Sequence, residues 1–242
     1  MTFKAEILEI ARSVAAEEPD WAFSSSGDFV SKRLKHTDLI VSPGFTFNAA
    51  PSCIVQPFSA IRNKKIVRLC KAILGRDPFW TLSITFQLES ERYRGPDSVS
   101  NIYPARFPFT TANGEHVTWP RSFITKADTP DYLRNVLADG TAFINKYFDL
   151  QSEESLLRHL PVTYRWMDQG IGKSGRMGSF YDQADGIIHC LAAIVIGDFG
   201  FVEMYQSDVI KTSMPKREQD LAKIKNALPE LRRRYEATGS IF

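Results

Sequence analysis

The stretch that decides the fold is SCIVQPFSAIRNKKIVRLCKAILG, from Ser52 to Gly75. Its beginning, SCIVQPF at 52–58, is rich in β-branched and aromatic residues and is bounded by turn-forming residues, so it predicts a strand. From Asn63 onward the pattern changes, because apolar residues recur at helical spacing at Ile66, Leu69, Cys70 and Ile73. Asn63 can cap this helix and Gly75 can end it. A strand followed closely by an amphipathic helix predicts a fold that mixes both kinds of element.

Patterns on either side predict the rest of the first half. An amphipathic helix is expected over 3–18, and short apolar segments predict strands at 29–34 and 37–42. FWTLSITFQLES at 79–90 alternates and predicts a further strand. In FPFTTANGEHVTW at 107–119, the Asn113-Gly114 pair accepts the positive φ angles of a tight turn, which predicts a hairpin.

Helical patterns dominate the second half. TPDYLRNVLADGTAFINKYFDL at 129–150 has Thr129 as its expected cap, and further helices are expected over 152–160, 182–196 and 214–239. Pro229 should kink or break the last of them, because proline removes a helical hydrogen bond. The predicted class is therefore α+β, with an antiparallel sheet and helices in the first half and a mostly helical second half. We expect two domains or subdomains, 1–126 and 127–242.

Composition narrows the class of protein. The chain has 242 residues, a formal net charge of +2 and 43% hydrophobic residues, which is typical of globular proteins. The start lacks a signal-peptide pattern, and the longest apolar run, CLAAIVIG at 190–197, is too short to span a bilayer. Cys53, Cys70 and Cys190 are isolated in sequence, so we expect buried thiols in a reducing compartment. These features predict a cytoplasmic protein that does not bind membranes.

Charge is distributed unevenly along the chain. The segment 32–76 carries nine Lys or Arg against one acid, whereas 177–210 carries no Lys or Arg and five acids. Within the latter, GDFGFVEMYQSD at 197–208 places aromatic residues and Met beside carboxylates, as protein-binding surfaces do. The alternative is that the rings are core residues and the acids are solvated. On the binding interpretation, the contacts with a basic protein partner are Asp182, Asp185, Asp198, Glu203, Tyr205 and Asp208.

No motif of catalysis, cofactor binding or metal binding is complete. GIGKSGRMG at 170–178 ends like a phosphate-binding loop, but Met167 stands where the first glycine belongs, and no buried strand precedes it. The four histidines lack metal-ligand spacing, and Asp182 and Asp185 are better explained as helix-capping acids than as a metal pair. We therefore predict no catalytic residue, no cofactor and no metal. His189, beside Cys190, is expected to be a core residue.

KHTDLIVSPGFTF at 35–47, CIVQP at 53–57, the helix from Asn63 and the strand from Phe79 together resemble uncharacterised bacterial α+β proteins of the toxin-immunity type. The resemblance implies a non-enzymatic immunity protein that occludes the active site of a secreted antibacterial toxin, such as a nuclease or a type VI secretion effector. Two alternatives stay open. One is an enzyme for a phosphate-bearing ligand, using Lys173, Ser174 and Arg176. The other, less favoured, is a nucleic-acid-binding module that uses the basic segment 32–76.

Overall fold

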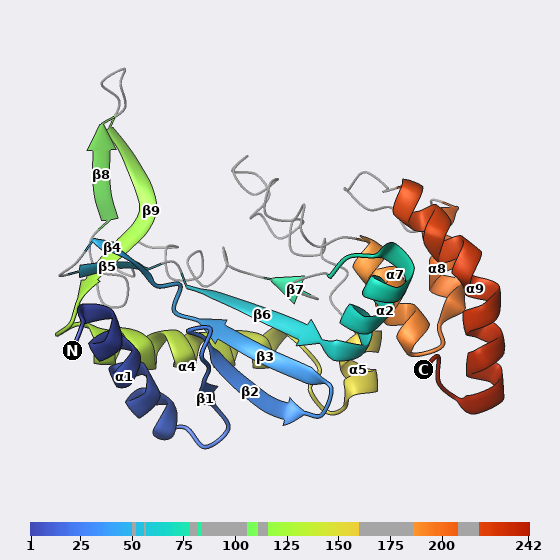
Figure 1. Cartoon of the computed structure of the whole chain (residues 1–242), viewed down its shortest axis with the longest axis horizontal. Coiled ribbons are helices and arrows are strands. Elements are labelled where there is room, and N and C mark those ends of the chain that lie inside the picture. The colour runs from blue at the N-terminus through green and yellow to red at the C-terminus, as the bar shows by residue number, and fades with distance from the viewer. Residues whose placement is uncertain are drawn as a thin grey trace. The chain divides into compact units, whose positions relative to one another are not determined.

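The computed structural model describes residues 1–49, 52–55, 57–77, 82–83, 106–110, 116–159, 186–207 and 218–242 (Figure 1). Across these ranges the fold is α+β, with antiparallel sheets and helices in the first half and a mostly helical second half. The predicted class is thus confirmed. No helix in these ranges is both long enough and apolar enough to cross a membrane.

The strands form two sheets. The first has the order β1-β2-β3-β6-β7, and its strands are Ala22–Phe23, Phe29–Leu34, Thr37–Ser42, Phe58–Asn63 and Leu82–Ser83. The second has the order β4-β5-β9-β8, with strands Thr46–Ala49, Ser52–Val55, His116–Thr125 and Arg106–Thr110. The expected hairpin is present, because β8 pairs antiparallel with β9 in a register that places Thr110 opposite His116. Its turn, at 111–115, lies outside the described residues, as does most of the predicted strand 79–90.

The single strand expected over 52–58 is wrong, because this segment contributes to two strands in different sheets. β5 ends at Val55 and β6 begins at Phe58. Pro57 lies between them and has no N–H group to donate to a ladder, which favours a change of direction at this point. The chain therefore leaves the β4-β5-β9-β8 sheet and enters the other sheet within a few residues.

The chain divides into two compact units. The first comprises residues 1–33, 38–60 and 84–146, and the second comprises 34–37, 61–83 and 147–242. The first holds helices α1 (Phe3–Ala16) and α4 (Thr129–Tyr147). The second holds α2 (Lys64–Leu74), α5 (Glu153–Arg158), α7 (Gly186–Val195), α8 (Phe199–Gln206) and α9 (Glu218–Thr238). This division does not coincide with the expected boundary near residue 126, and whether the halves 1–126 and 127–242 are domains stays a prediction.

Helix α4 packs closely within the first unit. At Gly140 an added Cβ would lie 2.5 Å from Cγ2 of Val41 on β3, so only glycine permits this approach. The Tyr132 hydroxyl donates a 2.6 Å hydrogen bond to the Pro43 carbonyl, which fixes the chain after β3 against α4. The expected cap at Thr129 is wrong: its hydroxyl donates to the Thr125 carbonyl, whereas the carbonyl of Asp128 accepts from the Tyr132 N–H.

The second unit is built on α2 and α7. As predicted, the Asn63 side chain caps α2, accepting from the N–H groups of Lys65 and Ile66 at 3.0 and 3.1 Å. Gly75 ends the helix with a φ of 74°, a conformation that favours glycine. Helix α7 is almost wholly buried, which fits its apolar sequence. The three cysteines are buried, as expected.

Helix α9 continues through Pro229, so the predicted break is wrong, whereas a kink at this position stays a prediction. Leu221 and Ile224 before the proline and Leu231 after it are all buried, so packing on both sides holds the helix together. Pro229 itself is exposed. Water can therefore bond the carbonyl group that the missing N–H leaves without its helical partner.

Candidate binding cavity

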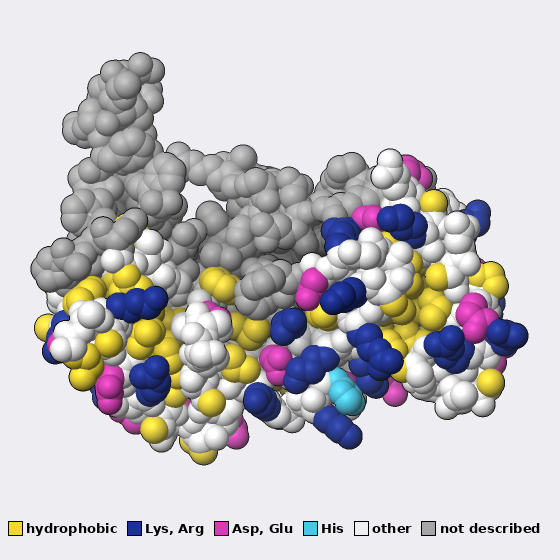
Figure 2. Space-filling view, in the orientation of Figure 1, with side chains coloured by type: hydrophobic (Ala, Val, Ile, Leu, Met, Phe, Trp, Pro, Cys, Tyr) yellow, Lys and Arg dark blue, Asp and Glu magenta, His cyan; other side chains and the backbone are white. Residues whose placement is uncertain are grey.

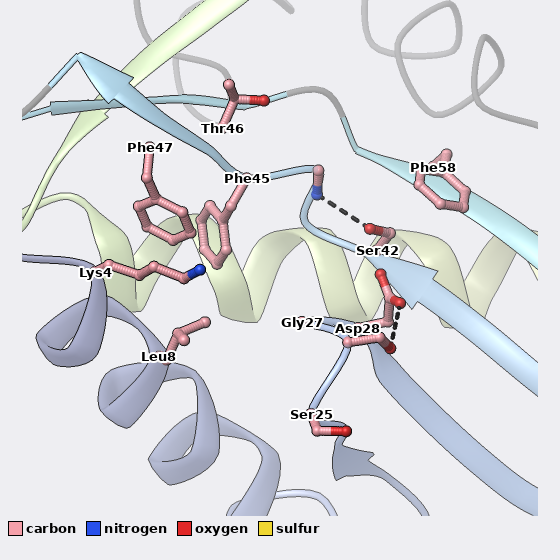
Figure 3. Close-up of a pocket in the computed structure, with 12 residues that line it drawn as sticks. Lys4, Leu8, Ser25, Gly27, Asp28, Ser42, Phe45, Thr46, Phe47 and Phe58 are labelled. Carbon is pink, nitrogen blue, oxygen red and sulfur yellow. Dashed lines mark hydrogen bonds between the residues drawn. The ribbon is translucent and has the colours of Figure 1, made fainter.

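A cavity with a volume of about 560 Å³ lies in the first unit. We call it the Phe45 cavity. Its walls come from four separate segments of the chain, namely α1, the β1–β2 turn, the chain around the end of β3 and the beginning of β6. They contribute Lys4 and Leu8, residues 25–28, Ser42, residues 44–47, and Phe58. Figure 3 shows Lys4, Leu8 and two phenylalanine rings on one side and Ser25, Asp28 and Ser42 on the other.

The β1–β2 turn presents hydroxyl groups to the cavity. The chain reverses between Phe23 and Phe29, which face each other across the two strands. Gly27 takes a φ of 94°, which side-chain-bearing residues rarely adopt, and its N–H bonds the Ser24 carbonyl at 3.1 Å. The Ser26 hydroxyl donates to the Asp28 carboxylate at 2.9 Å. The turn is therefore held by its own short polar side chains, and Ser25 and Ser26 stay exposed.

Aromatic rings form the opposite wall. The rings of Phe45 and Phe47 are 5.5 Å apart and tilted by 44°, and Phe3 lies edge-on to Phe47 at 6.4 Å. Phe45 also contacts Tyr132 of α4 at 6.2 Å. Because Phe45, Phe47 and Phe58 are only half-buried, ring surface is left open to the cavity, which is the lining that small-molecule sites commonly use.

Lys4 places a positive charge at this aromatic wall. Its ammonium nitrogen lies 5.6 Å from the centroid of the Phe47 ring, within the range of a cation–π interaction. Two other cations of the same unit are already paired: Lys126 with Glu6 at 2.7 Å and Arg134 with Glu17 at 2.8 Å. Those pairings lower the pKa of Glu6 and of Glu17 through hydrogen bonds to the cations. No described carboxylate lies within 4 Å of Lys4.

Of the partner contacts expected from the sequence, the structure describes Asp198, Glu203 and Tyr205. The Asp198 carboxylate caps α8, accepting from the Phe201 N–H at 3.2 Å. Glu203 is exposed but bonds Arg232 of α9 at 2.7 Å. Tyr205 is 1% exposed, so the expectation that it is a surface contact is corrected: its ring is a core side chain. Asp182, Asp185 and Asp208 lie outside the described residues.

Comparison with known proteins does not indicate a function for the Phe45 cavity. No protein-family model, curated protein or solved structure matches this chain. The resemblance to proteins of the toxin-immunity type therefore stays a prediction, and the argument for function depends on the geometry.

A serine, a histidine and an aspartate meet at the start of α5, which the sequence analysis did not foresee. The Ser155 hydroxyl donates to the Asp149 carboxylate, and the His159 Nδ1 lies 3.4 Å from that hydroxyl oxygen and 3.6 Å from the carboxylate. Asp149 also accepts from the Gln151 N–H at 3.0 Å. These bonds, with that to Ser155 the largest contribution, lower the pKa of Asp149. A catalytic triad instead places the histidine between serine and acid, so we interpret this cluster as a network that fixes the chain before α5, whose N-cap is Ser152.

The remaining sequence candidates have structural surroundings of their own. His189, on α7, is half-buried, and burial lowers its pKa to about 4, so its ring is neutral near pH 7. Adjacent Cys190 is fully buried, as expected for a core residue. No group of three or more potential metal ligands occurs among the residues that the structure describes. The loop at 170–178 lies outside them.

The basic segment 32–76 is divided between the two units. Figure 2 shows Lys and Arg side chains over α2 with Asp and Glu side chains among them. Arg76 bonds Asp220 at 2.5 Å, and the Arg68 guanidinium lies over the Phe242 ring at 4.8 Å. Part of this basic charge therefore already has partners within the second unit.

Proposed function

We propose that this chain is a non-enzymatic binding protein that holds its ligand in the Phe45 cavity. The observation that carries the proposal is the cavity itself, about 560 Å³ in volume, with half-buried rings on one side and hydroxyl groups on the other. Ligand sites in proteins are commonly 300–1,000 Å³ and combine an apolar lining with a few polar groups that orient the ligand. Both features occur here in residues of one compact unit.

The polar groups of the cavity suit recognition. Serine and threonine hydroxyls both donate and accept hydrogen bonds, so they can satisfy a ligand's polar edge. The Ser42 oxygen already accepts from the Gly44 N–H at 3.2 Å, and the Pro43 carbonyl between them is bonded to Tyr132. Phe45 therefore follows a bend that is fixed at two points. A wall that is fixed before binding reduces the conformational entropy that the protein loses when a ligand binds.

A fragment screen by ligand-observed NMR tests the proposal. Fragments that bind the wild-type protein should lose binding in Leu8→Trp, because the Leu8 side chain of α1 points into the cavity (Figure 3) and a larger side chain there obstructs it. Ala16→Trp is the matched control, since Ala16 is exposed at the end of α1 and does not line the cavity. A screen without binders, or binders that persist in Leu8→Trp, would contradict the proposal.

A second candidate function is the toxin-immunity role, and one feature of α8 favours it. Met204 is 42% exposed, although large apolar side chains usually avoid water, and it follows Glu203 directly. Such a side chain beside a carboxylate suits docking to a protein with a basic surface. The pairing of Glu203 with Arg232 weakens the argument, because part of the negative charge is balanced within the chain.

Co-expression with the product of the neighbouring gene tests this second candidate. If that product is a toxin, the wild-type chain should restore growth and Glu203→Lys should not. Glu236→Lys is the control, because Glu236 is an exposed acid on α9 and the charge change is identical. Equal protection by both variants would show that this surface of α8 does not bind the toxin.

A further inference from the structure

We infer that the Phe45 cavity takes an aromatic carboxylate, with Lys4 holding the carboxylate and the rings of Phe45 and Phe47 holding the aromatic part. The inference depends on the proposed function, because it names the class of ligand for the same cavity. Three observations support it: the charge of Lys4, the position of the rings and the state of Asp28.

The first observation is that Lys4 has no anion. It lines the cavity and its ammonium lies over the Phe47 ring, yet no described carboxylate is within ion-pair distance. Lys126 and Arg134 of the same unit are each bonded to an acid, but Arg12, Lys32 and Arg33 have no described acid within ion-pair distance either. What distinguishes Lys4 is therefore its position at the cavity wall. Lys4 also lies in the first turn of α1, where the helix dipole favours negative charge. A ligand carboxylate beside Lys4 would satisfy both the ammonium and the dipole.

The second observation is that the rings adjoin this charge. The Lys4 side chain extends beneath Phe47 toward Phe45 in Figure 3, so a carboxylate held by Lys4 lies next to both rings. The two rings are 5.5 Å apart at an angle of 44°. A third ring can pack against their open surfaces, since aromatic pairs favour tilted and edge-on geometry at such distances. The ligand's aromatic part therefore belongs directly beside its carboxylate.

The third observation concerns Asp28, the acid that lines the cavity. Its carboxylate accepts the Ser26 hydroxyl at 2.9 Å, within a turn that Ser24 also stabilises through the Asp28 N–H. Asp28 lies on the side of the cavity away from the rings (Figure 3). Asp28 keeps its negative charge, but that charge lies away from the rings, whereas no described acid pairs with Lys4 beside them. An anionic group of the ligand is therefore favoured beside Lys4 and not beside Asp28.

Three probes of matched size test this inference: 3-phenylpropanoate, 3-phenylpropan-1-ol and 3-phenylpropylamine. Their dissociation constants are measured by NMR titration at low salt. We expect the anion to bind up to about fivefold more tightly than the alcohol, and the amine to bind most weakly, because Lys4 is exposed and an exposed ion pair contributes up to about 1 kcal/mol. Added salt should weaken the binding of 3-phenylpropanoate alone, because salt screens the attraction between its carboxylate and Lys4.

Variants separate the two proposals. Lys4→Gln should reduce the affinity of 3-phenylpropanoate to that of the alcohol, whereas Lys223→Gln, at an exposed lysine of α9, should not change it. Phe45→Leu should weaken all three probes. If the alcohol binds as tightly as the anion, or if Lys4→Gln has no effect, the carboxylate inference is overturned while the binding cavity stands. If no probe binds and the fragment screen also fails, both proposals fall.

Discussion

Replacing Gly186 with alanine should destabilise the protein, because the new methyl group has no room between α7 and α8. A Cβ at this position would lie 2.3 Å from the Tyr205 hydroxyl oxygen and 2.5 Å from two carbons of its ring. The ring cannot move into solvent, since Tyr205 is 1% exposed. Overpacking of this kind costs about 1–3 kcal/mol. Alanine's higher helix propensity returns at most about 1 kcal/mol, so the expected net loss is about 1–2 kcal/mol.

Urea unfolding followed by circular dichroism measures this loss as a lower midpoint at unchanged slope. Gly200→Ala in α8 is the control, because its Cβ would lie 3.7 Å from the nearest neighbouring atom, the Asp198 Oδ1. It should not destabilise the protein, and the helix propensity of alanine should raise stability by at most about 1 kcal/mol. A Gly186→Ala protein as stable as the wild type would refute the packing argument. Tyr205 would then be free to move, and its expected role as a partner contact would return.

Three further measurements follow from the same structure. Burial lowers the pKa of His189 to about 4 from the ordinary 6.5, so only the unfolded chain gains a proton at this position as the pH falls from 6.5 to 4. The free energy of unfolding should therefore fall by up to about 3 kcal/mol over that range. Urea unfolding at pH 7 and pH 4 measures this loss, which should be smaller in His189→Gln. Glu203→Gln should change the urea midpoint by the equivalent of less than about 1 kcal/mol, because the pair with Arg232 is exposed; a larger loss would mean that this pair fixes α8 to α9. Burial raises the pKa of the Cys53 thiol to about 11, and all three cysteines are buried. A thiol reagent at neutral pH should therefore label no cysteine promptly in the folded protein and all three in urea. Prompt labelling before unfolding would contradict the buried positions.

Local pattern predicted the elements whose ends are chemically marked. Helix α2 has a capping Asn63 and a terminating Gly75, and both act as expected. The strands 29–34 and 37–42 were found at their predicted bounds. The segment 52–58 was not divided correctly, because β5 and β6 differ by the partners they meet, and partners are distant in sequence. Pro229 does not break α9 for a related reason, since buried leucines on both sides hold the helix together.

The Phe45 cavity could not be predicted from sequence, because it exists only where four segments meet. Lys4 belongs to the first helix, whereas Phe45 and Phe58 come from segments on either side of β5. The sequence did contain hints: two phenylalanines separated by one residue, at 45 and 47, and a run of three serines before Gly27. Neither pattern is specific, since paired rings are usually core residues and serine runs are usually exposed turns. Only their opposition across a cavity makes them a candidate site.

The uneven charge of the sequence illustrates how a linear pattern misleads about a surface. The segment 177–210 lacks any Lys or Arg, which predicted an acidic face. In the folded chain α9 supplies arginine to it: Arg232 bonds Glu203, and its guanidinium also lies 5.3 Å from the Phe199 ring. Charges separated by twenty-nine positions thus become neighbours. What matters for binding is therefore which charges have no ion-pair partner after folding. In the first unit, Lys4 has no described acid within ion-pair distance and lies against the aromatic wall of the Phe45 cavity.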